Sequence, residues 1–294
     1  MKVLIFGASG MIGSAMFRVL SAKTGWQVWG TLRSDKAKEF FSDDQQYKLM
    51  AGFDVEKHDA LVRIFALVKP DVVVNCIGLT KHHKVAEDPQ IALPLNALLP
   101  HRMADLCAVA GARLIHVSTD CVFAGTKGNY KEGDAPDAKD VYGKSKHLGE
   151  VDYPHAITLR TSTIGHELQS AHGLLEWFLS QQGSCKGFNK AIFSGMPNTE
   201  FARVVRDVVI PRLDLQGLYH VSGDPISKYE LLKLIARIYG KQIDIFCDDE
   251  FMIDRSLNSA CFNQASGYKA AGWPELIQDM HSFRKHGAKQ EKHV

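Results

Sequence analysis

The sequence predicts an α/β fold of the Rossmann type: a doubly wound parallel sheet followed by a smaller C-terminal substrate-binding lobe. A glycine-rich turn at residues 7–13 joins an apolar strand to a helix. Short apolar runs then alternate with helical segments as far as about residue 165. Small hydroxyl residues follow two of these runs, at 118–119 and 161–163. In open parallel sheets, ligands bind at these carboxyl ends of the strands.

Composition narrows the class of protein. A hydrophobic content of 45% and a charged content of 23% are typical of a soluble globular enzyme. The formal charge of +2 indicates neither a nucleic-acid partner nor a membrane surface, and no run approaches the ~20 apolar residues of a membrane span. The six cysteines have no metal-type or redox-type spacing. We therefore expect a cytoplasmic protein with reduced thiols and no metal site.

The first predicted strand covers residues 2–6, and the helix after the turn runs to about residue 22. Gly7, Gly10 and Gly13 form the turn between them. Glycine permits a tight turn and lets the backbone approach a pyrophosphate, which the amino terminus of a helix attracts. The spacing is one residue longer than Gly-x-Gly-x-x-Gly. The turn predicts dinucleotide binding, although glycine-rich turns without a ligand also exist.

The second strand, residues 27–32, bears on the choice of cofactor. It ends at Arg33, and no acidic residue stands where a carboxylate would bond the ribose of NAD. An arginine at that place can pair with a 2′-phosphate, so NADPH is favoured and NADH stays possible. The alternative is an exposed loop arginine.

A short third strand near residues 47–51 leads to Asp54 and Val55. This pair stands where a side chain can reach the adenine of a dinucleotide. Asp54 fits equally well as a cap of the predicted helix over residues 56–68.

The fourth strand, residues 71–76, ends in the turn 76–78. Its small residues would let the riboses of a cofactor lie close to the backbone. His82 follows in a loop, where we interpret it as a residue able to contact substrate. The helical stretch 87–110 contains two prolines that should start or kink parts of it. Asn96, a poor helix former, either holds a bend near the active site or lies on the surface.

The fifth strand, residues 114–117, precedes Ser118, Thr119 and Asp120. Tyr142 and Lys146 stand four residues apart at the start of a helix predicted to run to about residue 151, and therefore share one face. An ammonium near a phenol lowers the pKa of the phenol, so this pair can act as a tuned general acid. Alone, the spacing fits an aromatic residue and a solvated lysine equally well. The glycine-rich turn favours the catalytic interpretation.

A sixth strand at 156–160 completes two mononucleotide-binding halves in series. The sequence thus predicts a NAD(P)-binding domain over residues 1–165, which segment 191–221 rejoins through a strand at 191–194, a helix at 200–212 and a strand at 218–221. The remaining segments, 166–190 and 222–294, are expected to form the substrate-binding lobe. A helix with a serine cap is predicted over 227–239, and a closing helix over 274–283. In this lobe Arg255 can grip an anionic substrate group bidentately or form a surface ion pair.

Several of these motifs occur together in one known family. The three glycines of the turn, Asn96, residues 118–120 and the Tyr142/Lys146 pair resemble the extended short-chain dehydrogenase/reductases. The stretches 116–125 and 142–150 are most similar to the active-site segment of the dTDP-4-dehydrorhamnose reductases.

The resemblance assigns roles to residues of this chain. The implied catalytic residues are Thr119, Tyr142 and Lys146. The implied cofactor-binding residues are Gly7, Ser9, Gly10, Met11, Ile12, Arg33, Asp54, Val55, Cys76, Ile77, Gly78 and Lys146. The expected substrate contacts are His82, Val122, Phe123, Thr163 and Arg255.

The resemblance implies NADPH-dependent reduction of a 4-keto-6-deoxy sugar nucleotide, a step in the synthesis of cell-surface polysaccharide precursors. The expected partner is a nucleotide-sugar substrate, and a homodimer is compatible with the family. Two positions depart from the family pattern. Cys121 stands where tyrosine is common, and Thr163 where an aromatic residue near the sugar is usual. These departures leave the sugar and the nucleotide open.

Two other functions are compatible with the same motifs. One is a nucleotide-sugar epimerase that retains NAD, against which Arg33 argues. The other is a cofactor-binding regulatory subunit, because a methionine adenosyltransferase regulatory subunit resembles the same reductases. The intact Thr119, Tyr142 and Lys146 set argues against this second alternative.

Overall fold

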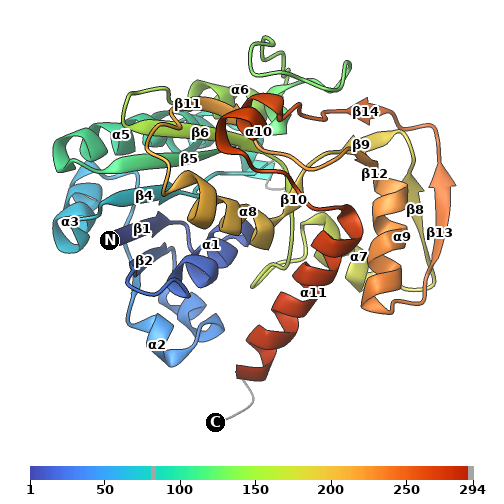
Figure 1. Cartoon of the computed structure of the whole chain (residues 1–294), viewed down its shortest axis with the longest axis horizontal. Coiled ribbons are helices and arrows are strands. Elements are labelled where there is room, and N and C mark those ends of the chain that lie inside the picture. The colour runs from blue at the N-terminus through green and yellow to red at the C-terminus, as the bar shows by residue number, and fades with distance from the viewer. Residues whose placement is uncertain (81–83, 291–294) are drawn as a thin grey trace.

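The computed structural model describes residues 1–80 and 84–290, so His82 lies outside the described residues. A seven-stranded parallel sheet, in the order β11-β6-β5-β4-β1-β2-β3, lies in one half of the molecule (Figure 1). The predicted fold class is therefore confirmed. The strands are β1 (Lys2–Phe6), β2 (Gln27–Leu32), β3 (Leu49–Ala51), β4 (Val72–Asn75), β5 (Arg113–Thr119), β6 (Ala156–Thr161) and β11 (Gly217–His220).

Both faces of this sheet are covered, which explains why its strands are apolar throughout. In β1, Val3 and Ile5 face one core cluster, whereas Leu4 and Phe6 face another. The helices that contribute to the first cluster are α1 (Met11–Ser21), α8 (Asn198–Val204) and α10 (Ala260–Ser266). Those of the second are α3 (His58–Val68) and α5 (Leu99–Ala110). None of the helices in the described part of the chain combines the length and apolarity needed to cross a bilayer.

The segment 191–221 divides between two parts of the molecule. Strand β11 pairs with β6, and α8 packs against α1. Strand β9 (Ala191–Phe193), however, pairs with β12 (Ile226–Ser227) and β14 (Ile253–Asp254) in a separate small sheet. The prediction that this strand joins the main sheet is therefore wrong. Strand pairing depends on partners distant in the sequence, which a local apolar run does not identify.

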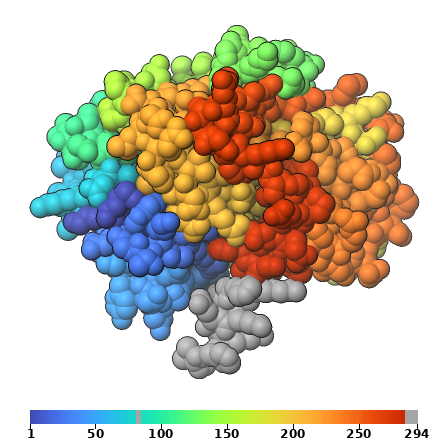
Figure 2. All heavy atoms as spheres, viewed as in Figure 1, coloured from blue at the N-terminus to red at the C-terminus, as the bar shows by residue number. Residues whose placement is uncertain are grey.

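The C-terminal lobe is built around a core of its own. Its helices are α7 (Leu174–Ser180), α9 (Lys228–Tyr239) and α11 (Trp273–Gln290), and its further strands are β7 (Thr163–Ile164), β8 (Ser184–Phe188), β10 (Met196–Pro197) and β13 (Asp244–Asp248). Helix α9 begins as predicted, because Ser227 Oγ accepts a hydrogen bond from the amide of Glu230. In Figure 2 the gold segment that contains α8 lies between the blue N-terminal segment and the red helix α11. The lobe is thus packed directly onto the sheet domain.

Candidate active site

Tyr142 lies in the first turn of α6 (Val141–Leu148), which is shorter than predicted. The Asp140 carboxylate begins this helix by accepting a hydrogen bond from the Gly143 amide. A Cβ on Gly143 would lie 2.3 Å from the Cys121 carbonyl oxygen, so the helix packs closely against the turn that follows β5. Thr119, at the carboxyl end of β5, acts on the pKa of the Tyr142 phenol as a side-chain hydrogen-bond partner. Two of the expected catalytic residues therefore lie near each other.

The electrostatics of Tyr142 differ from the sequence expectation. Burial raises the pKa of Tyr142, and the neighbouring Asp120 and Asp140 add to this effect, while the bond to Thr119 opposes it. The third expected residue, Lys146, points its Nζ at the Val117 carbonyl oxygen, 2.8 Å away. The expectation that an ammonium makes this phenol acidic is therefore wrong for the protein alone. Desolvation of the phenolate is the largest cause of the raised pKa.

Lys146 is itself perturbed. Its side chain is buried, and burial lowers its pKa from 10.5 to about 8, while the charges of Glu150 and Cys76 oppose the shift. Cys76 carries no charge near neutral pH, because burial raises the pKa of its thiol to about 12. The amine thus titrates close to physiological pH, where an exposed lysine stays protonated.

The glycine-rich turn and the turn after β4 lie against each other. Gly7 has φ +83°, and a Cβ on it would lie 3.0 Å from Ile77 Cγ1 and 3.2 Å from the Cys76 carbonyl carbon. A Cβ on Gly13 would lie 2.0 Å from the Gly7 oxygen, so α1 crosses directly over the turn. Only glycine fits at these two positions. Because β1 pairs with both β2 and β4, this contact marks the switch point of the sheet.

The start of α1 suits an anion. Gly10 is its N-cap, no side chain caps it, and its first turn has no acidic residue. The amides of Met11 and Ile12 are thus at the positive end of the helix dipole. Ser9 lies half-buried beside them. These features form a cradle of the kind that holds a pyrophosphate.

The turn after β4 also reaches Lys146. A Cβ on Gly78 would lie 3.8 Å from Lys146 Nζ and 3.6 Å from Asn96 Oδ1. The predicted cofactor turns and the predicted catalytic helix therefore lie close together, and we refer to the place where the turns 7–13 and 76–78 approach Lys146 as the crevice. Binding of a dinucleotide there stays a prediction.

Asn96 is fully buried, not a surface residue, and lies in the π-helix Leu93–Leu98. Its Oδ1 accepts a hydrogen bond from the Leu79 amide at 2.8 Å. Its Nδ2 donates to the Leu79 carbonyl at 3.1 Å and to Ser145 Oγ at 3.1 Å. This single side chain thus ties the loop after β4 to the helix that carries Tyr142 and Lys146.

The adenosine end of the expected cofactor site lies at the ends of β2 and β3. Arg33 is exposed there, and Val55 is half-buried. Asp54 accepts a hydrogen bond from the Glu56 amide at 3.1 Å and lies 3.8 Å from Lys57. Helix α3 has Lys57 as its N-cap and no side-chain cap hydrogen bond, so the alternative interpretation of Asp54 as the cap of this helix is wrong. Contacts of all three residues to a cofactor stay predictions.

The expected substrate residues separate into two groups. Val122 and Phe123 are completely buried, and the Phe123 ring is stacked on that of Tyr130 with the ring centroids 4.1 Å apart. Their side chains belong to the core, so the predicted contact to substrate would have to come from their backbone and stays a prediction. Thr163 is half-buried in β7. Arg255 Nε donates to the Phe123 carbonyl at 2.8 Å, and its Nη1 lies 3.9 Å from Cys121 Sγ. Arg255 thus reaches the edge of the site from the C-terminal lobe.

Sequence reasoning missed a buried ion pair behind the site. Arg160, on β6, donates twice to Glu150, with both distances 2.7 Å. Ser118 donates to the same carboxylate at 2.7 Å, so its hydroxyl proton is engaged by Glu150. The available signal was a charged residue inside an apolar strand, which requires a buried partner.

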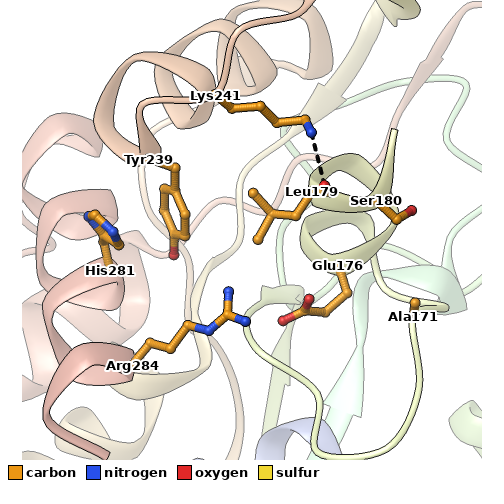
Figure 3. Close-up of a pocket in the computed structure, with 8 residues that line it drawn as sticks. All are labelled: Ala171, Glu176, Leu179, Ser180, Tyr239, Lys241, His281 and Arg284. Carbon is orange, nitrogen blue, oxygen red and sulfur yellow. Dashed lines mark hydrogen bonds between the residues drawn. The ribbon is translucent and has the colours of Figure 1, made fainter. Parts of the chain in front are cut away.

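Two cavities lie in the C-terminal lobe. A cavity of about 660 Å³ opens between α7, α11 and the end of α9, where Arg284 and Glu176 extend toward each other (Figure 3). His166 connects Glu176 to Tyr239, at 2.5 Å and 2.9 Å. No residue assigned from the sequence lines it. The second cavity, about 210 Å³, is lined by Leu174, Trp177, Lys186, Phe188, Lys228 and Leu232.

Comparisons with known proteins agree with this architecture. Methionine adenosyltransferase 2 subunit beta of Xenopus tropicalis is 28% identical over 251 residues, which cover 78% of this chain and 70% of the relative. The crystal structure of dTDP-4-dehydrorhamnose reductase from Bacillus anthracis, in complex with NADP, superposes with a TM-score of 0.77 at 18% identity, covering 96% of this chain and 99% of that one. The Bordetella bronchiseptica enzyme WbmG, in complex with NAD, gives 0.78 at 20% identity, covering 100% and 97%.

A family profile covers most of the chain. The profile described as the RmlD substrate-binding domain matches residues 1–245. The sheet order and the glycine-rich turn described above agree with this match. The chain therefore belongs to the RmlD substrate-binding domain family and has the fold of the extended short-chain dehydrogenase/reductases.

Proposed function

We propose that this protein is an NADPH-dependent reductase of a 4-keto-6-deoxy sugar nucleotide, of the dTDP-4-dehydrorhamnose reductase type. The observation that carries the proposal is the proximity of the Tyr142 phenol to Thr119, together with that of Lys146 to the turn after β4. A proton donor and a bordering dinucleotide cradle are the two parts that ketone reduction needs.

Tyr142 is the proposed general acid. A bound nicotinamide would supply the hydride to the carbonyl carbon. Tyr142 transfers its phenolic proton to the ketone oxygen as that oxygen gains negative charge, and its phenolate recovers a proton from solvent. The raised pKa of Tyr142 suits this direction, because the phenol stays protonated throughout the physiological range.

Thr119 and Lys146 orient the reaction. The Thr119 hydroxyl, which also accepts a hydrogen bond from the Cys121 amide at 3.1 Å, is fixed to align the ketone oxygen with the phenol. Lys146 would hold the nicotinamide ribose together with the turn 76–78. Gly7, Gly10, Met11 and Ile12 would hold the pyrophosphate.

The second cavity is the proposed place for the nucleotide of the substrate. Trp177 and Phe188 offer aromatic rings on which a base can stack. Lys186 and Lys228 stand at the same cavity and can attract phosphate oxygens. This combination of flat apolar rings and cations suits a nucleoside diphosphate.

The test is a screen of 4-keto nucleotide sugars for loss of nicotinamide absorbance, with NADPH and NADH in parallel. We expect consumption of NADPH with at least one substrate and slower consumption of NADH. Stoichiometric product with no net consumption of either cofactor would instead favour an epimerase. No turnover with any keto sugar, despite saturable NADPH binding, would contradict the reductase proposal.

A regulatory subunit is the second candidate, favoured by the 28% identity to methionine adenosyltransferase 2 subunit beta over 78% of this chain. In that case the crevice would bind a cofactor without turning it over. Co-purification with a methionine adenosyltransferase catalytic subunit, together with inactivity on every keto sugar, would support it.

A further inference from the structure

A line of three buried polar side chains lies beneath the crevice and joins β4, β5 and α6. Asn75 Nδ2 is 3.2 Å from His116 Nδ1, and His116 Nε2 is 3.5 Å from Lys146 Nζ. Asn75 and His116 are completely buried and Lys146 nearly so. Because these side chains are buried, the protons in this line are assigned by the protein partners that each atom has.

Asn75 determines the tautomer of His116. The Ile77 amide donates to Asn75 Oδ1 at 3.0 Å, which places the carbonyl oxygen of Asn75 toward the backbone and its NH₂ group toward the imidazole. His116 Nδ1 must therefore accept a hydrogen bond, and the ring proton lies on Nε2. Turning the Asn75 amide over would set two donors against each other at Ile77. The ring is neutral, because burial and the charge of Lys146 hold its pKa well below the usual value.

The Nε2–H group of His116 consequently faces the amine of Lys146. An ammonium has only donors, so it opposes this N–H, whereas a neutral amine has a lone pair that accepts from it. Lys146 keeps its bond to the Val117 carbonyl in either state. We propose that His116 is a positioning residue, which holds the Lys146 side chain against Val117 and favours the neutral amine over the ammonium.

The charged and titratable groups around Lys146 agree with this proposal. Burial is the largest cause that lowers the pKa of Lys146 to about 8, and Glu150, at the end of α6, acts against it. Cys76, after β4, is a neutral thiol, and His101, on α5, acts on His116. Burial and the facing Nε2–H group of His116 both lower the pKa of the Lys146 amine. The test therefore has to separate these two effects.

The proposal is tested with selectively ¹³C- and ¹⁵N-labelled lysine and histidine in the full chain, followed by NMR titration. The Lys146 signal is assigned by its loss in Lys146→Arg. We expect the wild-type His116 ring to carry its proton on Nε2, and the midpoint of the Lys146 titration to lie near pH 8. A proton found on Nδ1 would overturn the proposal without any variant.

Two substitutions separate the facing donor from burial. His116→Gln keeps a polar group at the position of Nε2, but its amide can turn an oxygen toward the lysine. His116→Leu removes the donor and keeps the site apolar. We expect the Lys146 midpoint to rise by about one pH unit in His116→Gln, and to rise less in His116→Leu. An unchanged midpoint in the folded His116→Gln protein would show that burial alone acts, and would refute the proposal.

The matched control is His101→Gln, since the His101 ring bonds Tyr153 and the Leu148 carbonyl and not Lys146. It should leave the Lys146 midpoint in place. The titration requires neither cofactor nor substrate, although its relevance to catalysis rests on the proposed function. A protein without reductase activity could still show the His116 effect, so the two proposals fail separately.

Discussion

At the scale of single residues, the site combines two groups that burial moves in opposite directions. Burial raises the pKa of the Tyr142 phenol and lowers that of the Lys146 amine, since both charged forms lose their hydration. Tyr142 therefore keeps its proton at neutral pH, whereas Lys146 loses its proton more readily than an exposed lysine. A reductase requires the first property, and a ribose-binding amine is compatible with the second.

Tyr142→Phe removes the proposed proton donor and leaves the ring that packs beside Thr119. Turnover of a keto-sugar substrate should fall by about 100-fold or more, because general acid catalysis commonly contributes that much. Cofactor affinity should stay within about twofold, a small change on the scale where tenfold is 1.4 kcal/mol. Steady-state kinetics and NADPH fluorescence titration measure the two effects. Unchanged turnover with a genuine substrate would remove Tyr142 from the mechanism.

Lys146→Met tests the buried amine through stability. The pKa of Lys146 is lower in the folded protein (about 8) than its ordinary 10.5, so the unfolded chain binds more protons between these values. Wild-type stability should therefore gain from this residue as pH rises from 8 to 10.5. Relative to wild type, the variant should be more stable at pH 7 than at pH 10 by about 2 kcal/mol.

Urea unfolding at the two pH values measures this difference. The matched control is Lys144→Met, an exposed lysine on the same helix, whose effect should not change with pH. Equal effects of Lys146→Met at both values would mean that the amine keeps an ordinary pKa when folded.

At the scale of helices and strands, the sequence predicts most of the nucleotide-binding sheet. Strands β1 and β2 have their expected bounds, and β6 is within one residue, because each is a short apolar run between turn residues. Helix α9 follows from its serine cap. These features depend on neighbours in the chain, which the sequence displays directly.

The unpredicted features depend on contacts between distant residues. The π-helix Leu93–Leu98 exists where Asn96 turns its side chain inward to Leu79 and Ser145, and no periodicity marks it. The pairing of Glu150 with Arg160 and of Asn75 with His116 likewise requires the fold. The candidate catalytic set was recognisable from spacing and resemblance, but the direction of the Tyr142 pKa was not, because it follows from burial.

Asn96→Ala tests the connection between these elements. Loss of the Asn96 amide group leaves the buried backbone amide and carbonyl of Leu79 without a side-chain partner. This should lower the free energy of unfolding by about 2–4 kcal/mol. Turnover should fall as well, because α6 is no longer tied to the loop after β4. Thermal and urea unfolding give the first quantity, and steady-state kinetics the second.

The control for this substitution is Asn189→Ala, an exposed asparagine bonded to Asp249. Its effect on unfolding should be within about 0.5 kcal/mol. Similar losses of unfolding free energy at the two positions would show that the buried hydrogen bonds of Asn96 stabilise the protein no more than those of an exposed asparagine.

At the scale of the molecule, the sheet domain is not a contiguous stretch of chain. The core on one of its faces contains residues of α8, of the segment 205–221 and of α10 beside those of β1 and α1. Asn198 Nδ2 donates to the Met11 carbonyl at 2.7 Å, so the start of α8 touches the start of the helix at the proposed pyrophosphate cradle. Every residue assigned to cofactor binding precedes position 165, yet the sheet that holds them is completed more than fifty residues later by β11 (Gly217–His220).

Truncation distinguishes a contiguous domain from a divided one. A fragment of residues 1–165 contains the whole proposed cofactor crevice but lacks β11 and α8. It would expose the edge of β6 and the apolar surface of α1, which in the intact chain is covered by side chains such as Phe201 and Val205. We expect this fragment to unfold without cooperativity and to bind NADPH weakly. A fragment of residues 1–221 keeps all seven strands and should retain a cooperative urea transition, at lower stability than the full chain. If the shorter fragment unfolds as cooperatively as the longer one, the division of the domain is wrong and the chain from 191 onward serves only the substrate-binding lobe.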